Sequence, residues 1–164
     1  MKHWGANLFP TMKPSPLLNI LFLATFFVLA AVLNGADFAI EKTKGEGLRI
    51  LHKGKPFAEY VVDQANKPYL YPVYGPTGAA MTRNYPMKKI EGERHDHPHH
   101  RGINFGHEGI GGADSWSEQL TWDELGKNPK RAKLVADRIK ALGSIKHRSY
   151  EKLVATDEHA FVVE

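Results

Sequence analysis

Short runs of apolar and aromatic residues, separated by turn-forming residues, follow one another through most of the chain. Leu48–Ile50 and Phe57–Val62 lie on either side of the turn-rich break Lys53–Pro56, which is typical of two neighbouring β-strands. Tyr69–Tyr74 is aromatic and β-prone, but Pro72 has no amide hydrogen to donate, which predicts a sheet edge or a bulge. Turn residues that recur every ~8–12 residues favour an antiparallel β-sandwich or barrel.

The second half of the chain has a less regular pattern. Pro86–Gly102 is rich in charge and histidine and is predicted to be a loop, and Ile103–His107 a further short strand. Arg131–Leu142 contains good helix formers, but its apolar positions only partly make one face, so a helix and a strand pair are both open. Ala160–Val163 is again β-like. The fold class that we predict is therefore all-β.

The longest apolar stretch lies near the start, at Leu17–Leu33, and is slightly shorter than the about 20 apolar residues that a spanning helix needs. Lys13 precedes it and the short residues Asn34–Ala36 follow it, which is the pattern of a secretory signal peptide. We expect residues 1–36 to be a cleaved signal peptide, with an uncleaved signal anchor as the alternative. Either form places the remaining chain outside the cytoplasm, and membrane contact is expected only through this segment.

Residues 37–164 then form one β-sandwich domain, and because Glu164 ends the chain within a β-like run, we expect the domain to be truncated at its C-terminus. The chain has no cysteine, which excludes disulfides, thiolate metal sites and cysteine nucleophiles. Its formal charge is +4, but the basic residues after Lys127 alternate with carboxylates. We expect no nucleic-acid partner.

The segment from His95 to His107 holds five of the nine histidines and is the strongest chemical signal. Imidazole titrates near neutral pH and is a common ligand for zinc, copper and iron, although no HExxH or zinc-finger spacing occurs here. Two or three of these side chains are expected to converge with His107. They could bind a divalent transition metal, they could act as an acid–base pair beside Arg101 as a substrate clamp, or they could be structural.

Other chemistries find less support. Gly106–Gly112 is glycine-rich, but no Lys-Ser or Lys-Thr pair follows it, so nucleotide binding is rejected. No Gly-x-Ser-x-Gly elbow accompanies Ser115 or Ser117. Several aromatic side chains near the histidines, Trp116 among them, could stack on the apolar faces of sugars, with packing in the sheet core as the alternative.

Four motifs in order resemble one known family. They are Lys67–Gly78, Thr82–Pro86, His97–His107 and Asp114–Trp116, and together they cover roughly residues 45–125. The chain resembles the family often labelled "methane oxygenase PmoA", which consists mostly of exported bacterial proteins of unknown activity. The resemblance implies an all-β fold, a large sandwich of the kind seen in sugar mutarotases, and members about twice as long as this chain.

The label itself does not carry over. A membrane methane monooxygenase subunit crosses the bilayer many times, and a chain with one apolar run cannot build such a helical bundle, so we expect no methane oxidation. The family commonly has an aromatic residue where His99 stands, so His99 and His95 are predicted to be bystanders. The positions that match the family pattern are His97, His100, Arg101 and His107.

The function expected from the sequence is that of an exported, carbohydrate-related enzyme or binding protein that uses a His/Arg cluster. The alternatives are a metal-binding protein that uses the same histidines and a non-catalytic envelope or interaction protein. The candidate catalytic residues are His97, His100, Arg101 and His107, the candidate substrate-binding residues are Tyr74, Arg83, Asp114 and Trp116, and the alternative metal ligands are His97, His100 and His107.

Overall fold

The computed structural model describes residues 36–164. The predicted signal segment, with its apolar run at 17–33, lies outside the described residues except for its last position. Within residues 36–164, no helix has the length and apolar character that a membrane crossing requires.

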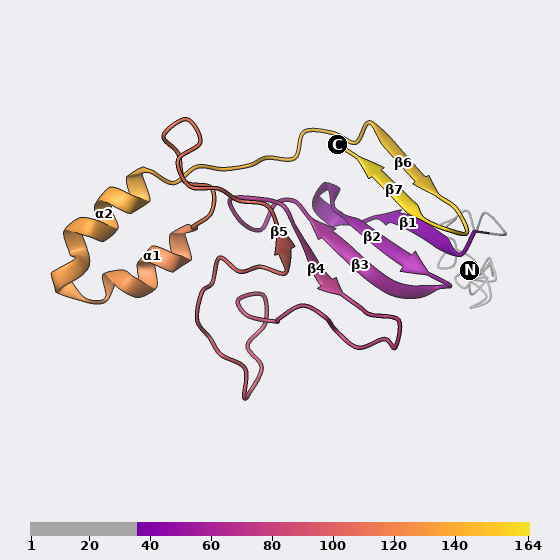
Figure 1. The fold of residues 1–164 in the computed structure, drawn as a ribbon, viewed down its shortest axis with the longest axis horizontal. Helices are drawn as coiled ribbons and strands as arrows, with labels where there is room; N and C mark the ends of the chain where they lie inside the picture. The colour runs from indigo at the N-terminus through magenta and orange to yellow at the C-terminus, as the bar shows by residue number, and fades with distance from the viewer. Residues whose placement is uncertain (1–35) are drawn as a thin grey trace, which may run out of the picture. The chain divides into compact units, whose positions relative to one another are not determined.

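One antiparallel sheet of five strands organises this part of the chain, and its strands follow one another in sequence order (Figure 1). A separate hairpin lies beside the first strand, where the amide of Phe38 donates to the carbonyl of Thr156 at 3.0 Å. The described residues do not close into a sandwich. The sheet strands are β1 (Phe38–Lys42), β2 (Leu48–His52), β3 (Lys55–Val61), β4 (Tyr69–Val73) and β5 (Ile103–Asn104), and the hairpin strands are β6 (Lys152–Ala155) and β7 (Ala160–Val163).

The first predicted strands are confirmed. Strands β2 and β3 are joined by Lys53 and Gly54, both with positive φ (50° and 72°), and two such residues form the turn whose twist suits a hairpin. Pro72 stands where the pairing of β3 with β4 shifts register, between the Ala58–Val73 and Tyr60–Leu70 partners. The expected bulge at the proline is therefore present.

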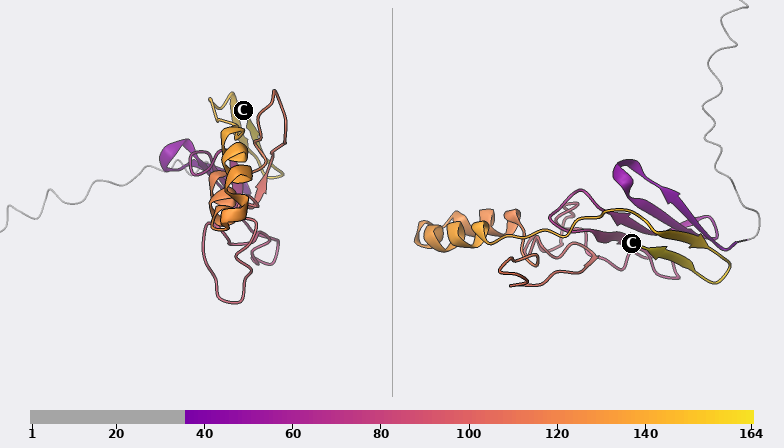
Figure 2. Two further views of the ribbon diagram at one scale, coloured as in Figure 1. Left: turned by 90° about the vertical axis from the view of Figure 1, so that its left-hand side faces the viewer. Right: turned by 90° about the horizontal axis from the view of Figure 1, so that it is seen from above.

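The prediction of a β fold is confirmed in its coarser form: the described residues are mainly β, although not all-β. Two helices follow the sheet, α1 (Gln119–Gly126) and α2 (Ala132–Lys140), which Figure 1 shows side by side. In the right-hand view of Figure 2 both helices lie beyond the end of the sheet. Between them, Asn128 accepts a hydrogen bond from the amide of Lys130 and Pro129 starts a short 3-10 turn. Good helix formers with one inward-facing stripe, which buries Val135, explain why the helix and not the strand pair forms.

Buried polar residues make up an unusual share of the interior. The apolar core is small, and around it lie side chains that carry charge or hydrogen-bonding groups. Buried polar groups are stable only when they have hydrogen-bond or ion-pair partners, so their positions show where polar contacts stabilise the interior. The buried apolar residues are Leu48, Ala58, Tyr69, Tyr71, Val73, Tyr85 and Val135, and the buried polar residues are Lys67, His99, Asp114, Ser115, Ser117 and Glu118.

Candidate functional site

The histidine-rich segment forms a tight turn. In an extended strand, alternate side chains would instead have pointed to the same side. The amide of His100 donates to the carbonyl of His97 at 3.0 Å, which closes a four-residue turn around Pro98 and His99. His97 has a positive φ of 49°. Because the turn brings its first and last residues side by side, the rings of His97 and His100 stack with centroids 5.1 Å apart and planes 16° from parallel.

Four rings meet at this turn, and we name them the ring cluster: His97, His99, His100 and Trp116. The His99 ring lies edge-on to His100, with centroids 4.5 Å apart, and Trp116 lies 5.7 Å from both of these histidines. His97 and His100 are exposed, Trp116 is 42% exposed, and His99 is buried. The cluster therefore presents three rings to solvent and holds the fourth beneath them.

His99 anchors the turn to helix α1. Its Nδ1 lies 3.0 Å from the hydroxyl oxygen of Thr121, in the first turn of the helix. The same hydroxyl oxygen accepts from the amide of Glu118 at 3.5 Å, so its hydrogen is available to His99. This arrangement favours the His99 tautomer that carries its proton on Nε2.

A buried ion pair lies under the ring cluster. The Nε and Nη2 atoms of Arg101 donate to the two carboxylate oxygens of Glu118 at 2.8 and 2.9 Å, and the two side chains are only 13% and 5% exposed. The guanidinium also lies over the Tyr69 ring, 5.7 Å from its centroid. Burial lowers the pKa of Arg101, but the bonds to Glu118 outweigh it and raise that pKa. Arg101 is committed to the scaffold and is not a free clamp at the surface.

Two further buried charged side chains, Lys67 and Asp114, each bond the backbone of the segment that carries Trp116. The ammonium group of Lys67, which is 1% exposed, donates to the carbonyl of Trp116 at 2.8 Å. One carboxylate oxygen of Asp114 accepts from the amides of Trp116 and Ser117 at 2.8 and 3.0 Å. Burial lowers the pKa of Lys67, while Glu118 and Asp114 oppose that shift. Asp114 therefore shapes the backbone at Trp116 from inside.

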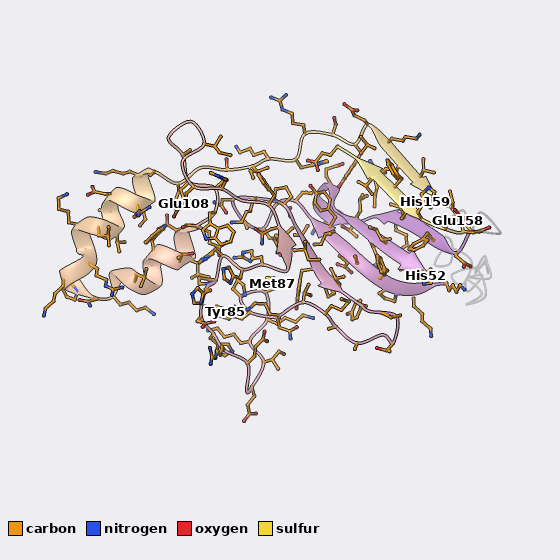
Figure 3. The ribbon with its side chains drawn as sticks, viewed as in Figure 1. His52, Tyr85, Met87, Glu108, Glu158 and His159 are labelled. Atoms are coloured by element: carbon orange, nitrogen blue, oxygen red, sulfur yellow. The ribbon has the colours of Figure 1, made fainter. Side chains whose placement is uncertain are left out.

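The outer side of the turn is tied down by Arg83. Its Nη2 atom donates to the carbonyls of Arg94 and Asp96, each at 2.8 Å, and lies 3.3 Å from an Asp96 carboxylate oxygen. Asp96 also lies 3.3 Å from Nδ1 of His97. Farther out, His95 stacks on Tyr85, which Figure 3 labels, with ring centroids 5.1 Å apart. Arg83 thus positions the loop that presents His97.

The residues named from sequence divide into two groups. His97, His100, Arg101, Arg83, Asp114 and Trp116 surround the turn, through the contacts above. His107 is exposed, its ring bonds the carbonyl of Glu108, and the ring contacts among residues 36–164 do not join it to the cluster. Tyr74 follows the last residue of β4 and forms a β-bridge with Ala80. Strand β5 pairs with the opposite end of β4, at Tyr69 and Leu70. The expected convergence on His107 does not occur in the described residues.

The metal alternative lacks a geometric basis in the part of the chain that the structure describes. No group of three or more histidine or carboxylate side chains there is arranged to hold a metal ion. The near-parallel stack of His97 and His100 explains why, because rings packed face to face do not direct their nitrogens at a common point.

Several contributing residues carry no sequence signal of their own. His99, predicted to be a bystander, is the most buried of the loop histidines and packs its ring against His100. Lys67 opens the first of the four family motifs, which is the one signal that could have identified it. Glu118 and Thr121 lie beyond these motifs, and only the fold brings them to the turn.

Burial and neighbouring charges favour the neutral form of two of the three imidazoles in the cluster. Burial, together with the nearby His100 and Lys67, lowers the pKa of His99 from 6.5 to about 4. His100 is exposed as a whole residue, but the neighbouring rings partly shield its imidazole from water, and this desolvation together with the charges of His97 and Arg83 lowers its pKa. At neutral pH both rings therefore offer one nitrogen that donates and one that accepts.

The depressed pKa of His99 predicts an acid-sensitive fold. The unfolded chain takes up a proton at this residue near pH 6.5, while the folded chain resists it down to about pH 4. Stability from this group is complete above pH 6.5 and falls as the pH drops through that window, because the unfolded state binds more protons. Urea unfolding of the wild type and His99→Phe across this range should show a shallower pH dependence for the variant. Parallel profiles for the two proteins would contradict the assignment.

Comparison with known proteins places the chain in a family. The model of the Family of unknown function (DUF6807) matches residues 47–164, which is most of the chain, and the chain belongs to this family. Searches of curated proteins and of solved structures gave no match. The matched region contains the ring cluster, the Arg101–Glu118 ion pair and the buried groups that hold Trp116, so the site lies within the part that the family model covers.

Proposed function

We propose that the ring cluster is a carbohydrate-binding surface, and that His100 is the group best placed to act as an acid or base on the bound sugar. The observation that carries this proposal is the combination of one broad apolar ring and two imidazoles on the same exposed patch. Trp116 is 42% exposed although its backbone is held on both sides by buried groups. A large ring that is kept exposed on a rigid support is suited to binding and not to core packing.

The chemistry of the patch suits a pyranose ring. The face of Trp116 offers an apolar π surface for the C–H groups of a sugar, and the neighbouring imidazoles offer donors and acceptors for its hydroxyls. Because the pKa of His100 is lowered by burial and by the charges of His97 and Arg83, its ring is neutral at neutral pH and can accept a proton. Arg101 and Glu118 support the patch from below.

The sandwich fold expected from the sequence is part of the same proposal. We infer that the five-stranded sheet is one layer of a sandwich of the sugar-mutarotase kind. A hollow over β4 and β5 supports this, because its lining includes Leu70, Ile103 and Phe105, and the last two are 56% and 68% exposed. A facing sheet would bury these apolar side chains. Export of the domain, inferred from the apolar run near the start, is part of the same proposal and is tested by mass spectrometry of the mature N-terminus.

Binding to a panel of monosaccharides and oligosaccharides, measured by titration calorimetry, tests the function. For the sugar that binds, Trp116→Ala and His100→Ala should each weaken binding by about tenfold or more, because each removes contact area or a hydroxyl partner. The matched control is the exposed pair of Phe161 on β7 and His159 just before it, whose ring centroids lie 6.1 Å apart. Alanine at either control position should leave binding unchanged.

Two outcomes would overturn the proposal. One is the absence of any heat of binding across the panel. The other is a sugar whose affinity falls equally in the control variants, since the patch would then not be the binding surface. A protein that binds no sugar, but takes up zinc or copper and gains thermal stability from it, would favour the metal alternative.

A further inference from the structure

A cationic surface lies on the helical hairpin, away from the ring cluster. We name residues 128–140 the cationic hairpin; they are the part of the helical hairpin formed by the 3-10 turn and α2. They carry five Lys or Arg side chains and one carboxylate, Asp137. The carboxylates that alternate with basic residues after Lys127 are sparse here, since the next one after Asp137 is Glu151. The basic residues are Lys130, Arg131, Lys133, Arg138 and Lys140, and all five are exposed.

An apolar side chain stands in the middle of these charges. Leu134 is 53% exposed, while Val135, the next residue, is the buried contact of α2. On a helix, side chains three and four positions apart are neighbours. Three of the four positions at this spacing from Leu134 are cationic: Arg138 lies within α2, and Lys130 and Arg131 lie in the 3-10 turn that leads into the helix.

The fourth helical neighbour of Leu134 does not cancel this charge. It is Asp137, whose carboxylate lies 2.9 Å from the ammonium of Lys133, so the carboxylate is paired within the helix. Arg138 lies 3.8 Å from Glu108, which Figure 3 labels near the helices, and over the Trp122 ring at 5.7 Å. What faces outward around Leu134 is a net positive surface with an apolar centre.

We propose that the cationic hairpin docks on an anionic membrane surface, with Leu134 inserted among the lipid headgroups. Charge complementarity selects the partner, because each Lys or Arg held near such a surface is attracted to its anionic lipids. The exposed leucine favours a lipid surface over other polyanions as the partner. A phosphate backbone or an acidic polysaccharide would pair with the cations but offers no apolar layer for Leu134, whereas the headgroup boundary accepts both.

This proposal is independent of the carbohydrate function. No residue of the cationic hairpin belongs to the ring cluster, and the apolar run near the start of the chain plays no part in the argument. The test must nevertheless use the full chain, in which that run could itself associate with lipid. The readout therefore has to report on the hairpin alone.

The absence of cysteine in the chain provides such a readout. Leu134→Cys, labelled with an environment-sensitive dye, reports on this position, and Lys55→Cys, an exposed site on β3, is the control. With vesicles of equal parts phosphatidylcholine and phosphatidylglycerol, we expect a blue shift at position 134 and none at 55. Vesicles of phosphatidylcholine alone, or high salt, should abolish the shift.

Charge variants complete the test. In the labelled protein, Lys130→Gln with Arg131→Gln should raise the vesicle concentration at half-maximal shift by about tenfold or more. Lys44→Gln with Lys53→Gln, which removes the same charge from exposed sites among the strands, should leave it within about twofold. No shift with anionic vesicles overturns the proposal, and so does an equal shift with neutral vesicles. A shift with RNA or heparin but not with lipid would assign the surface to another polyanion.

Discussion

Replacing Arg101 by methionine should lower the free energy of unfolding by about 3–5 kcal/mol, because it leaves a carboxylate buried without its counter-charge. Glu118 is 5% exposed, and both of its carboxylate oxygens accept from Arg101. Water cannot replace these donors at that depth. Urea denaturation, with the slope of the transition compared between proteins, measures the loss.

The control for Arg101 is an ion pair of the same type at the surface. Arg49 donates to Glu59 at 2.9 Å, but its side chain is 44% exposed. Arg49→Met should therefore cost less than about 1 kcal/mol. The double variant Arg101→Met with Glu118→Met should be less destabilised than Arg101→Met alone, since no charge is left stranded. Equal losses at Arg101 and Arg49 would show that the buried pair is not what holds the turn.

The second large effect is expected at Gly102, the residue after this arginine. Its φ is +53°, and a Cβ built there would lie 2.1 Å from the carbonyl oxygen of Leu70. Because the obstructing atom is backbone, relief requires β4 and the histidine turn to move apart. Gly102→Ala should cost about 3 kcal/mol or more, from the left-handed conformation and the overlap together.

A substitution at Gly78 distinguishes the cost of the left-handed conformation from the cost of the steric overlap. It also has a positive φ, +81°, but nothing lies within 4 Å of a Cβ built there. Gly78→Ala should therefore show only the conformational cost of about 1 kcal/mol. Urea unfolding gives both values, and near-ultraviolet circular dichroism reports whether Trp116 keeps its environment. A Gly102→Ala variant as stable as Gly78→Ala would contradict the close approach of the turn to β4.

The strands were predictable where the pattern is local. The β2–β3 hairpin follows from two apolar runs around Lys53 and Gly54, and the bulge at Pro72 follows from its missing donor. The helix α2 was one of two open interpretations, because its inward stripe is narrow. Helix α1 was missed, since its residues show no clear apolar face and its N-terminal cap is Glu118, which is not one of the residue types preferred at that position.

The candidate site was predictable in composition but not in arrangement. The sequence placed the chemistry among His97, His100, Arg101 and Trp116, all of which lie at the turn. It predicted a loop for Pro86–Gly102, in which two or three of the histidines would converge with His107 from the next strand. A four-residue turn closed by one backbone hydrogen bond changes which side chains meet, and residue spacing alone does not distinguish the two geometries.

By itself, then, the sequence determined the β-rich character, the absence of thiol chemistry and the short segment in which the unusual side chains gather. These follow from residue types and from periodicity, which are local properties. Only the tertiary structure decided three contacts. His99 packs inside, Arg101 forms an ion pair with Glu118 seventeen positions away, and Lys67 donates to the backbone carbonyl of Trp116. The reason is physical: a buried polar group is stable only with a partner, and the partner is chosen by proximity in the folded chain.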